Sequence, residues 1–374
     1  MIYLKSIVYQ LVCASLVLCC NIPTQTQNRQ QPFYKQFEGQ IGNHAAVLNL
    51  VKTGQLSQSL FLGYFYYKDS SVPTFLQGSH IFYPTDKFVS SIEVNSYQVE
   101  KSMIDTLRYS SDQVKLYAGY DNFTGSFESD TIFVGVFTNK NGEKLPFRLK
   151  EKLDRDSSFF DISFIKKDTF LDVGINKNVH VKLSVDLVKP INNSETNLSL
   201  QKNIFEVLTN CEGIYQNKST IDSCLSSHYS VRFSEYKIWK ANFFQFESVV
   251  LPIYNEKSLF SFACLDSYFT DRKEGYRISV RTYNKTTKQI IKFNDVFKIG
   301  SKDKIASLVR KWTNLNNISS FNFDENNFYM TDKSVVFVLT GLEENRYKID
   351  GKEFVYSFGQ IKDLVKPNFW NILK

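Results

Sequence analysis

Apolar and polar positions alternate most regularly between Tyr276 and Trp312. The first eight residues of this stretch alternate between two sides, which predicts a half-buried strand. Polar turn residues at 284–287 and an apolar, β-branched run at 289–293 predict a second strand that pairs with it as a hairpin. After Gly300, Ser301 and Asp303 favour the start of a helix. One face of that helix carries four apolar residues at helical spacing: Ile305, Leu308, Val309 and Trp312.

A different pattern fills residues 33–152, where short aromatic and apolar runs are separated by polar turns. Glycines at 39, 63, 125 and 135 stand at the start of such runs, as is typical of tight bends in an antiparallel meander or small barrel. The predicted fold class is therefore α+β. We expect a β-rich N-terminal domain over 33–152, followed by a mixed α+β region over 153–374 with an antiparallel sheet and short amphipathic helices.

The first 32 residues differ from both regions. Residues 1–20 contain Lys5 and an apolar run that is too short to span a membrane, which predicts a signal peptide. The run ends at Cys20 in a pattern that resembles a bacterial lipoprotein box, so we expect lipid attachment at Cys20; the alternative is an ordinary cleaved signal. Residues 21–32 are polar and rich in glutamine, which suits a flexible tether.

The segment KQIIKFNDVF at 288–297, with the strand before it and the short helix after it, resembles the C-terminal extracytoplasmic domain of RsiV-type anti-sigma factors. The resemblance covers residues 255–374 well. RsiV-type proteins bind lysozyme through this domain, so the resemblance implies a protein-binding role. Family members commonly carry a glycine-rich segment with a histidine before the first strand, whereas this chain has TDRKEG at 270–275, so any role of that histidine does not carry over.

Positive charge is concentrated in one part of the chain. The full sequence has a net charge of +7, and residues 271–312 contain 12 basic and four acidic residues. Several basic residues lie on the polar side of the predicted hairpin, where they would form a face that attracts anions. The alternative is a solvated face that maintains solubility. The candidate binding residues are Arg272, Lys273, Arg277, Arg281 and Lys288.

Cysteine positions agree with an oxidising compartment. Cys211 and Cys224 flank a loop rich in Gly, Asn and Ser that a disulfide would close, although two separate thiols remain the alternative. Cys264 lies in an apolar, strand-like run, where a buried thiol is the ordinary expectation.

Sequence motifs for catalysis are scarce. The four histidines are spread along the chain without metal-ligand spacing, and GxSxG, Walker and HExxH motifs are lacking. We therefore expect neither an enzyme nor a bound cofactor or metal. Tyrosines on outward strand positions, such as Tyr66 and Tyr283, offer surfaces for stacking on sugar rings, with packing in the core as the alternative.

Two functions remain after these exclusions. The first is an envelope binding protein, anchored to the membrane by its N-terminal lipid, that recognises a lysozyme-like hydrolase. The second is a cell-envelope module that binds a glycan or an anionic polymer, and an unrecognised hydrolase is a weaker third. The export signal argues against a nucleic acid as partner. The expected location is the cell envelope, facing the periplasm or the cell surface.

Overall fold

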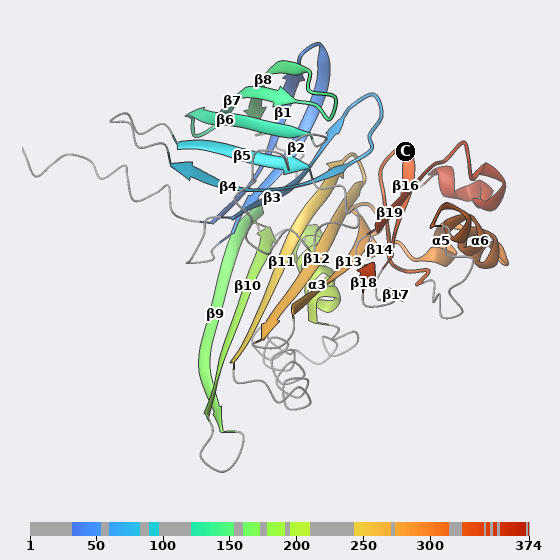
Figure 1. Cartoon of the computed structure of the whole chain (residues 1–374). Coiled ribbons are helices and arrows are strands. Elements are labelled where there is room, and N and C mark those ends of the chain that lie inside the picture. The colour runs from blue at the N-terminus through green and yellow to red at the C-terminus, as the bar shows by residue number, and fades with distance from the viewer. Residues whose placement is uncertain are drawn as a thin grey trace, which may run out of the picture. The chain divides into compact units, whose positions relative to one another are not determined.

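The structure is a computed structural model of the whole chain. It describes residues 32–53, 60–82, 90–96, 121–152, 160–172, 178–190, 195–209, 243–270, 274–313, 324–339, 342–344, 347–349, 352–371 and 373. Residues 32–374 form one compact unit. Within it, a closed barrel is followed by a six-stranded sheet and by two smaller sheets with short helices (Figure 1). The α+β class and the small N-terminal barrel predicted from the sequence are confirmed.

The barrel is an antiparallel meander of eight strands in chain order, closed by pairing of the first strand with the last. A meander of this kind needs only short connections between neighbours, which agrees with the regular spacing of runs and turns in the sequence. Its strands are β1 (Phe33–Ile41), β2 (His44–Lys52), β3 (Leu60–Tyr67), β4 (Thr74–Phe82), β5 (Ser90–Ser96), β6 (Asn122–Ser129), β7 (Ile132–Thr138) and β8 (Lys144–Glu151).

Phenylalanine rings fill the interior of the barrel. Phe37, Phe123, Phe133 and Phe147 belong to one buried cluster, and the rings of Phe133 and Phe147 lie 4.9 Å apart. Gly135 makes room for this packing, since a Cβ atom there would lie 2.1 Å from a backbone oxygen on β6 and 2.9 Å from the Phe147 ring. The barrel glycines therefore allow backbone and aromatic rings to approach closely.

The second sheet has the order β14-β13-β12-β11-β10-β9 and is antiparallel except at the β10–β11 pair. A parallel pair requires a crossover connection, and this one contains helix α3 (Glu195–Thr209). The helix packs on the sheet through Ile204 and Phe205, which are buried, and Tyr283 donates a hydrogen bond to the carbonyl oxygen of Thr196 at 3.2 Å. The strands are β9 (Phe160–Asp172), β10 (Asn178–Pro190), β11 (Phe243–Glu256), β12 (Leu259–Thr270), β13 (Glu274–Asn284) and β14 (Gln289–Ile290).

The C-terminal part continues the predicted order of strand, turn, strand and helix. β13 and β14 form the hairpin, but β14 ends at Ile290 because the Asp295 carboxylate accepts the backbone N–H of Lys292 and starts helix α5 (Phe293–Val296). Helix α6 (Ser301–Thr313) then buries Ile305 and Val309, as its apolar spacing predicts. The side chain of Trp312 lies outside the described part.

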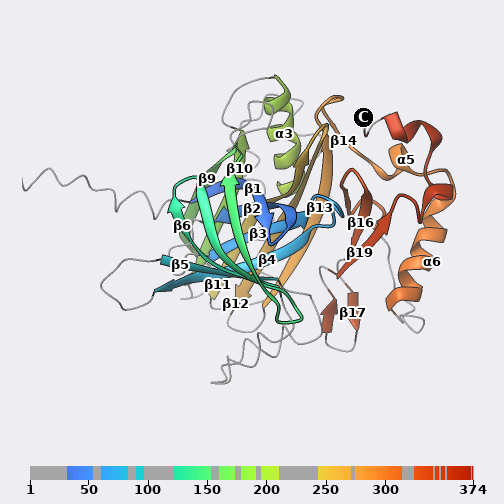
Figure 2. The ribbon, with the colours of Figure 1, turned by 90° about the horizontal axis from the view of Figure 1, so that it is seen from above.

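Both α5 and α6 lie beside a three-stranded sheet of order β15-β16-β19 (Figure 2). Phe297 joins them to it, since its ring lies 5.8 Å from that of Phe337. A chain segment after the sheet returns to the helices, where the N–H of Lys366 donates to the carbonyl oxygen of Val296 at 2.8 Å. The elements are β15 (Phe328–Met330), β16 (Ser334–Leu339), the hairpin β17 (Leu342–Glu344) and β18 (Tyr347–Ile349), β19 (Lys352–Ser357), and two 3₁₀ helices, η5 (Lys362–Leu364) and η6 (Pro367–Asn371).

The outer face of β1–β3 belongs to the same buried core as the second sheet. Alternate residues of β2 divide between the two cores: Leu48 and Leu50 face the barrel interior, and Val47 and Val51 face outward into the larger cluster. The Asn49 amide lies on the outward face and donates to the carbonyl oxygen of Ile253 on β11 at 2.9 Å. Strand β2 is therefore buried on both faces, which explains why its sequence is apolar without clear alternation.

Candidate functional site

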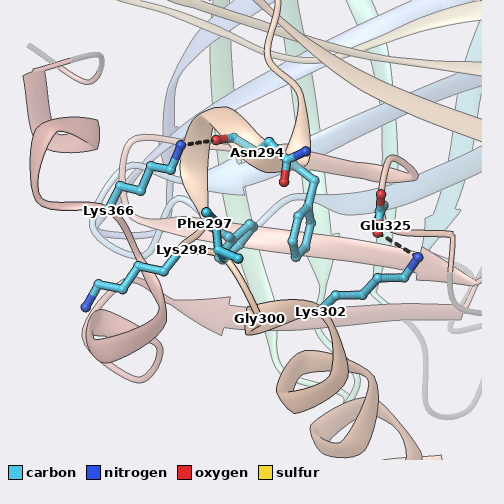
Figure 3. A pocket seen from close by; sticks show the side chains of 9 residues that line it. Asn294, Phe297, Lys298, Gly300, Lys302, Glu325 and Lys366 are labelled. Carbon is cyan, nitrogen blue, oxygen red and sulfur yellow. Dashed lines mark hydrogen bonds and ion pairs between the residues drawn. The ribbon is translucent and has the colours of Figure 1, made fainter.

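A cleft of about 490 Å³ lies where α5, α6 and the segment between η5 and η6 meet (Figure 3). Lys298 and Lys366 lie on one side of it, Lys302 and Glu325 on the other, and Phe297 lies between them. Its lining residues are Phe293, Asn294, Phe297, Lys298, Ile299, Gly300, Lys302, Glu325 and Lys366. We call this the lysine cleft, because three lysines against one glutamate give its lining a formal charge of +2.

Local chain geometry explains why the lysines converge. Gly300 has φ +80°, a left-handed conformation that lets the chain turn sharply from α5 into α6. The turn leaves Ile299 fully exposed. Helix α6 begins at Ser301, as predicted, and the Ser301 hydroxyl donates to the carbonyl oxygen of Leu364 at 3.2 Å, which ties the turn to η5. The N-terminal end of α6, with its partial positive charge, adds to the electrostatic character of the cleft.

Each lysine of the cleft is held by one protein oxygen. The Lys298 ammonium donates to the carbonyl oxygen of Asp363 at 2.8 Å, and the Lys366 ammonium donates to the carbonyl oxygen of Asn294. Lys302 forms an ion pair with Glu325 at 2.7 Å, and this hydrogen bond raises the pKa of Lys302 above its ordinary value. An ammonium group has three N–H donors, so one such contact fixes its direction and leaves capacity for a ligand.

A second cleft of about 480 Å³ is lined by Asn203, Glu206, Val207, Arg281, Gln289, Ile290, Ile291, Lys292 and Asn326. We call it the amide cleft, after its three carboxamide side chains. Arg281 lies at its wall, where its guanidinium donates to the carbonyl oxygens of Val280 and Asn326, both at 2.8 Å. This arginine therefore fixes the loop that carries Asn326.

The predicted binding face is only partly described by the structure. Arg272 and Lys273 lie outside the described residues, as does the side chain of Arg277. Arg281 lies in the amide cleft, and Lys288 lies at the β13–β14 turn, where it forms an ion pair with Glu195 of α3 at 2.8 Å. A single face built from all five residues stays a prediction.

Other predicted sites have different outcomes. Cys20, Cys211 and Cys224 lie outside the described residues, so lipid attachment and the disulfide stay predictions. Cys264 is a buried thiol, as expected. Tyr66 and Tyr283 are at most 2 % exposed, so neither offers a face to a sugar ring.

The residues that line the lysine cleft were largely missed from sequence. Lys298 belongs to the basic segment, but Glu325 and Lys366 come from separate segments. Only folding brings them to Lys302 and Asn294. A signal was present in the lysines at 298, 302 and 304 around Gly300, because a glycine turn before a helix places flanking residues close together.

Ionisable groups also gather where the barrel contacts the second sheet. Lys152 forms ion pairs with Glu38 at 2.6 Å and with Glu256 at 3.1 Å, and Tyr66 donates to Glu256 at 3.2 Å. Burial acts to raise the pKa of Glu38, but hydrogen bonds from Lys152 and Lys68 outweigh it and hold the pKa below its ordinary value. The group is a structural link, since neither cleft is lined by its members.

A further carboxyl group, half-buried, lies near the barrel. Burial raises the pKa of Glu353 on β19 to about 7, against the opposing effect of a 3.3 Å hydrogen bond from Tyr329. Burial raises the pKa of Tyr64, on the outer face of β3, and the negative charge of Glu353 raises it further. Perturbed carboxyl groups are common in active sites, but Glu353 lines neither of the two clefts.

Within the described ranges, no group of three or more His, Cys, Asp or Glu side chains has an arrangement suited to a metal ion. In the same part of the chain, no helix combines the length and apolar character needed to cross a membrane.

No protein-family model and no curated protein sequence matches the chain. The structure is similar to crystal structures of two DUF3298 family proteins. The protein from Bacteroides fragilis is 10% identical, with a TM-score of 0.42 over 59% of this chain and 99% of that one. The protein from Pseudomonas aeruginosa is 10% identical, with a TM-score of 0.37 over 56% of this chain and 96% of that one. The chain is thus structurally similar to bacterial DUF3298 proteins at low identity.

Proposed function

We propose that this chain is a binding protein of the bacterial cell envelope, lipid-anchored through Cys20, that acts without catalysis and binds an anionic envelope polymer at the lysine cleft. The observation that carries the proposal is the convergence of Lys298, Lys302 and Lys366 on one concave surface with a formal charge of +2. The export signal and the lipoprotein-box pattern at residues 1–20 support the location.

The free energy available from exposed ion pairs favours a polymer over a small anion as the ligand. Exposed ion pairs contribute only about 0.2–1 kcal/mol each, whereas a millimolar Kd already requires roughly 4 kcal/mol. Three lysines therefore bind a single carboxylate or phosphate weakly. A polymer with repeating anionic groups presents further groups to the same surface at a high effective concentration, which increases its apparent affinity.

A lysozyme-like hydrolase is the alternative partner, implied by the RsiV-type resemblance. Common lysozymes are strongly basic, so their surface would repel the lysine cleft. Such a partner would have to bind elsewhere on the chain. Affinity for a lysozyme that does not change when the cleft lysines are reversed in charge would therefore favour this alternative.

Calorimetric titration of the full-length protein with polygalacturonate, inorganic polyphosphate and hen lysozyme tests the proposal. The informative variant is Lys298→Glu with Lys366→Glu. The matched control reverses the exposed barrel residues Lys140 and Lys144, which gives the same change in net charge away from the cleft. We expect the cleft variant to lose polymer binding by about tenfold or more, since each lost pair also becomes a repulsion.

Salt provides an independent check, because binding through exposed charges weakens steeply between low and physiological ionic strength. Equal losses in the cleft variant and the barrel control would show that only net charge matters, and would refute a site at the lysine cleft. A protein that binds lysozyme but neither polymer would establish the alternative.

A further inference from the structure

We infer that the lysine cleft and the amide cleft are two parts of one groove, and that its ligand is an acidic polysaccharide. In this arrangement the lysine cleft holds acid groups, and the amide cleft holds the hydroxyl groups of neighbouring sugar units. The inference rests on the proposed function and narrows it from anionic polymers in general to one chemical class.

We base the continuity of the groove on two places in the chain where one residue lines one cleft and the next residue lines the other. Lys292 lines the amide cleft, and the next residue, Phe293, lines the lysine cleft. In the same way, Glu325 lines the lysine cleft and Asn326 lines the amide cleft. Consecutive Cα atoms are about 3.8 Å apart, so at both places neighbouring residues of the chain line the two clefts. In the inferred groove, a polymer that leaves one cleft passes these residues into the other.

A sugar acid carries both carboxylate and hydroxyl groups, and the linings of the two clefts differ accordingly. The lysine cleft offers ammonium groups for carboxylates. The amide cleft combines two cations, Arg281 and Lys292, with one acid, Glu206, for a smaller formal charge of +1. Its carboxamides belong to Asn203, Gln289 and Asn326.

A carboxamide both donates and accepts hydrogen bonds, which matches a hydroxyl group. The Asn203 amide group donates to the carbonyl oxygen of Ser199 at 2.8 Å, which holds its side chain in place. Gln289 is exposed at the rim, and Val207 and Ile290 are half-buried and provide apolar surface for the C–H face of a sugar ring. A simple polyphosphate would leave these groups unused.

An anionic bilayer is the main competing ligand, because the fully exposed Ile299 next to Lys298 would suit a lipid surface. A flat bilayer would contact the rim of the lysine cleft but would gain nothing from carboxamides in a neighbouring hollow. The amide cleft therefore favours the polysaccharide.

The test is a length series of oligogalacturonides, from the monomer to about twelve units, titrated into the full-length protein. The wild type is compared with an Asn203→Ala, Gln289→Ala variant and with the Lys140→Glu, Lys144→Glu control. In the wild type we expect the affinity to rise about tenfold or more with length and then reach a plateau, because units in the second cleft bind at a high effective concentration. In the amide-cleft variant the ratio of long-chain to short-chain affinity should fall towards one, while the barrel control keeps the wild-type ratio.

An unchanged length dependence in the amide-cleft variant, with binding retained, would overturn the groove and leave the proposed function standing. Equal affinity for polyphosphate and oligogalacturonide of matched charge would also overturn it. Failure of every polymer to bind would overturn both the groove and the proposed function, and binding to phosphatidylglycerol vesicles in that case would favour a membrane surface. Circular dichroism of the variant establishes that it is folded.

Discussion

Protonation of Glu353 should make the protein more stable in mild acid than at neutral pH. Glu353 is half-buried near Tyr64 and Tyr329, and desolvation of its carboxyl group raises its pKa from the ordinary 4.5 to about 7. The two tyrosines stay neutral across this range because burial raises their pKa values well above 10.0. Glu353 therefore titrates in contact with neutral hydrogen-bonding groups.

The sign follows from comparing the folded and unfolded chains. Below pH 4.5 the carboxyl group is protonated in both, and its contribution to stability is fully present. Between pH 4.5 and about 7 the unfolded chain releases the proton and the folded chain keeps it, so the free energy of unfolding falls as pH rises. At about 1.4 kcal/mol for each pH unit, the loss across this window is on the order of 3 kcal/mol.

Urea unfolding of the wild type and of Glu353→Gln at half-unit steps from pH 4 to 8 measures this effect. The variant keeps the shape of the protonated acid but cannot ionise. The difference in the free energy of unfolding between the two proteins should therefore change by about 3 kcal/mol, in favour of the variant, from pH 4.5 to 7. Glu128→Gln is the control, because Glu128 is 51% exposed on the barrel. If the free energy of unfolding depends on pH in the same way in the wild type and in Glu353→Gln, the titration is not that of Glu353 and the prediction is refuted.

Three further predictions concern stability and use the same unfolding assay. Gly135→Ala should destabilise the barrel by roughly 1–3 kcal/mol because its Cβ meets a backbone oxygen, whereas Gly359→Ala, whose Cβ would meet its nearest atom at 3.8 Å, should change little. Lys152→Met should cost roughly 1–3 kcal/mol, since two carboxylates lose their shared partner; equal stability would show that the link is unimportant. Ile305→Ala should cost roughly 2–5 kcal/mol as a core truncation, and the exposed neighbour Lys304 changed to alanine should cost almost nothing.

Local patterns predicted local structure well. The helix at 301–313 follows from the spacing of Ile305 and Val309, and the hairpin before it follows from alternation and a polar turn. The same patterns overextended β14, because a side chain that accepts a backbone N–H at Lys292 decides where the strand ends. This contact depends on the orientation of the Asp295 carboxylate, which the spacing of apolar residues in the sequence does not specify.

The candidate site could not be predicted in the same way. The sequence locates positive charge in residues 271–312, but charge counts do not distinguish structural cations from available ones. Lys288 binds Glu195 of α3, and Arg281 binds backbone oxygens of its own strand and of the loop before β15. Lys366, from a segment outside residues 271–312, completes the lysine cleft. Apart from the contact of Arg281 with Val280, these partners are far apart in the sequence, so only the fold decides which cations remain available to a ligand.

The outer face of β1–β3 argues that the barrel depends on the sheet beside it. Val47, Val51 and Leu62 on this face are at most 2 % exposed, yet they lie outside the barrel interior. A barrel without the second sheet would expose them to water and would leave the Asn49 amide without the carbonyl oxygen of Ile253. Exposing a contiguous apolar surface of this kind favours aggregation. The barrel therefore acts as a support that completes the core of the sheet, and β13 of that sheet carries Arg281 to the amide cleft.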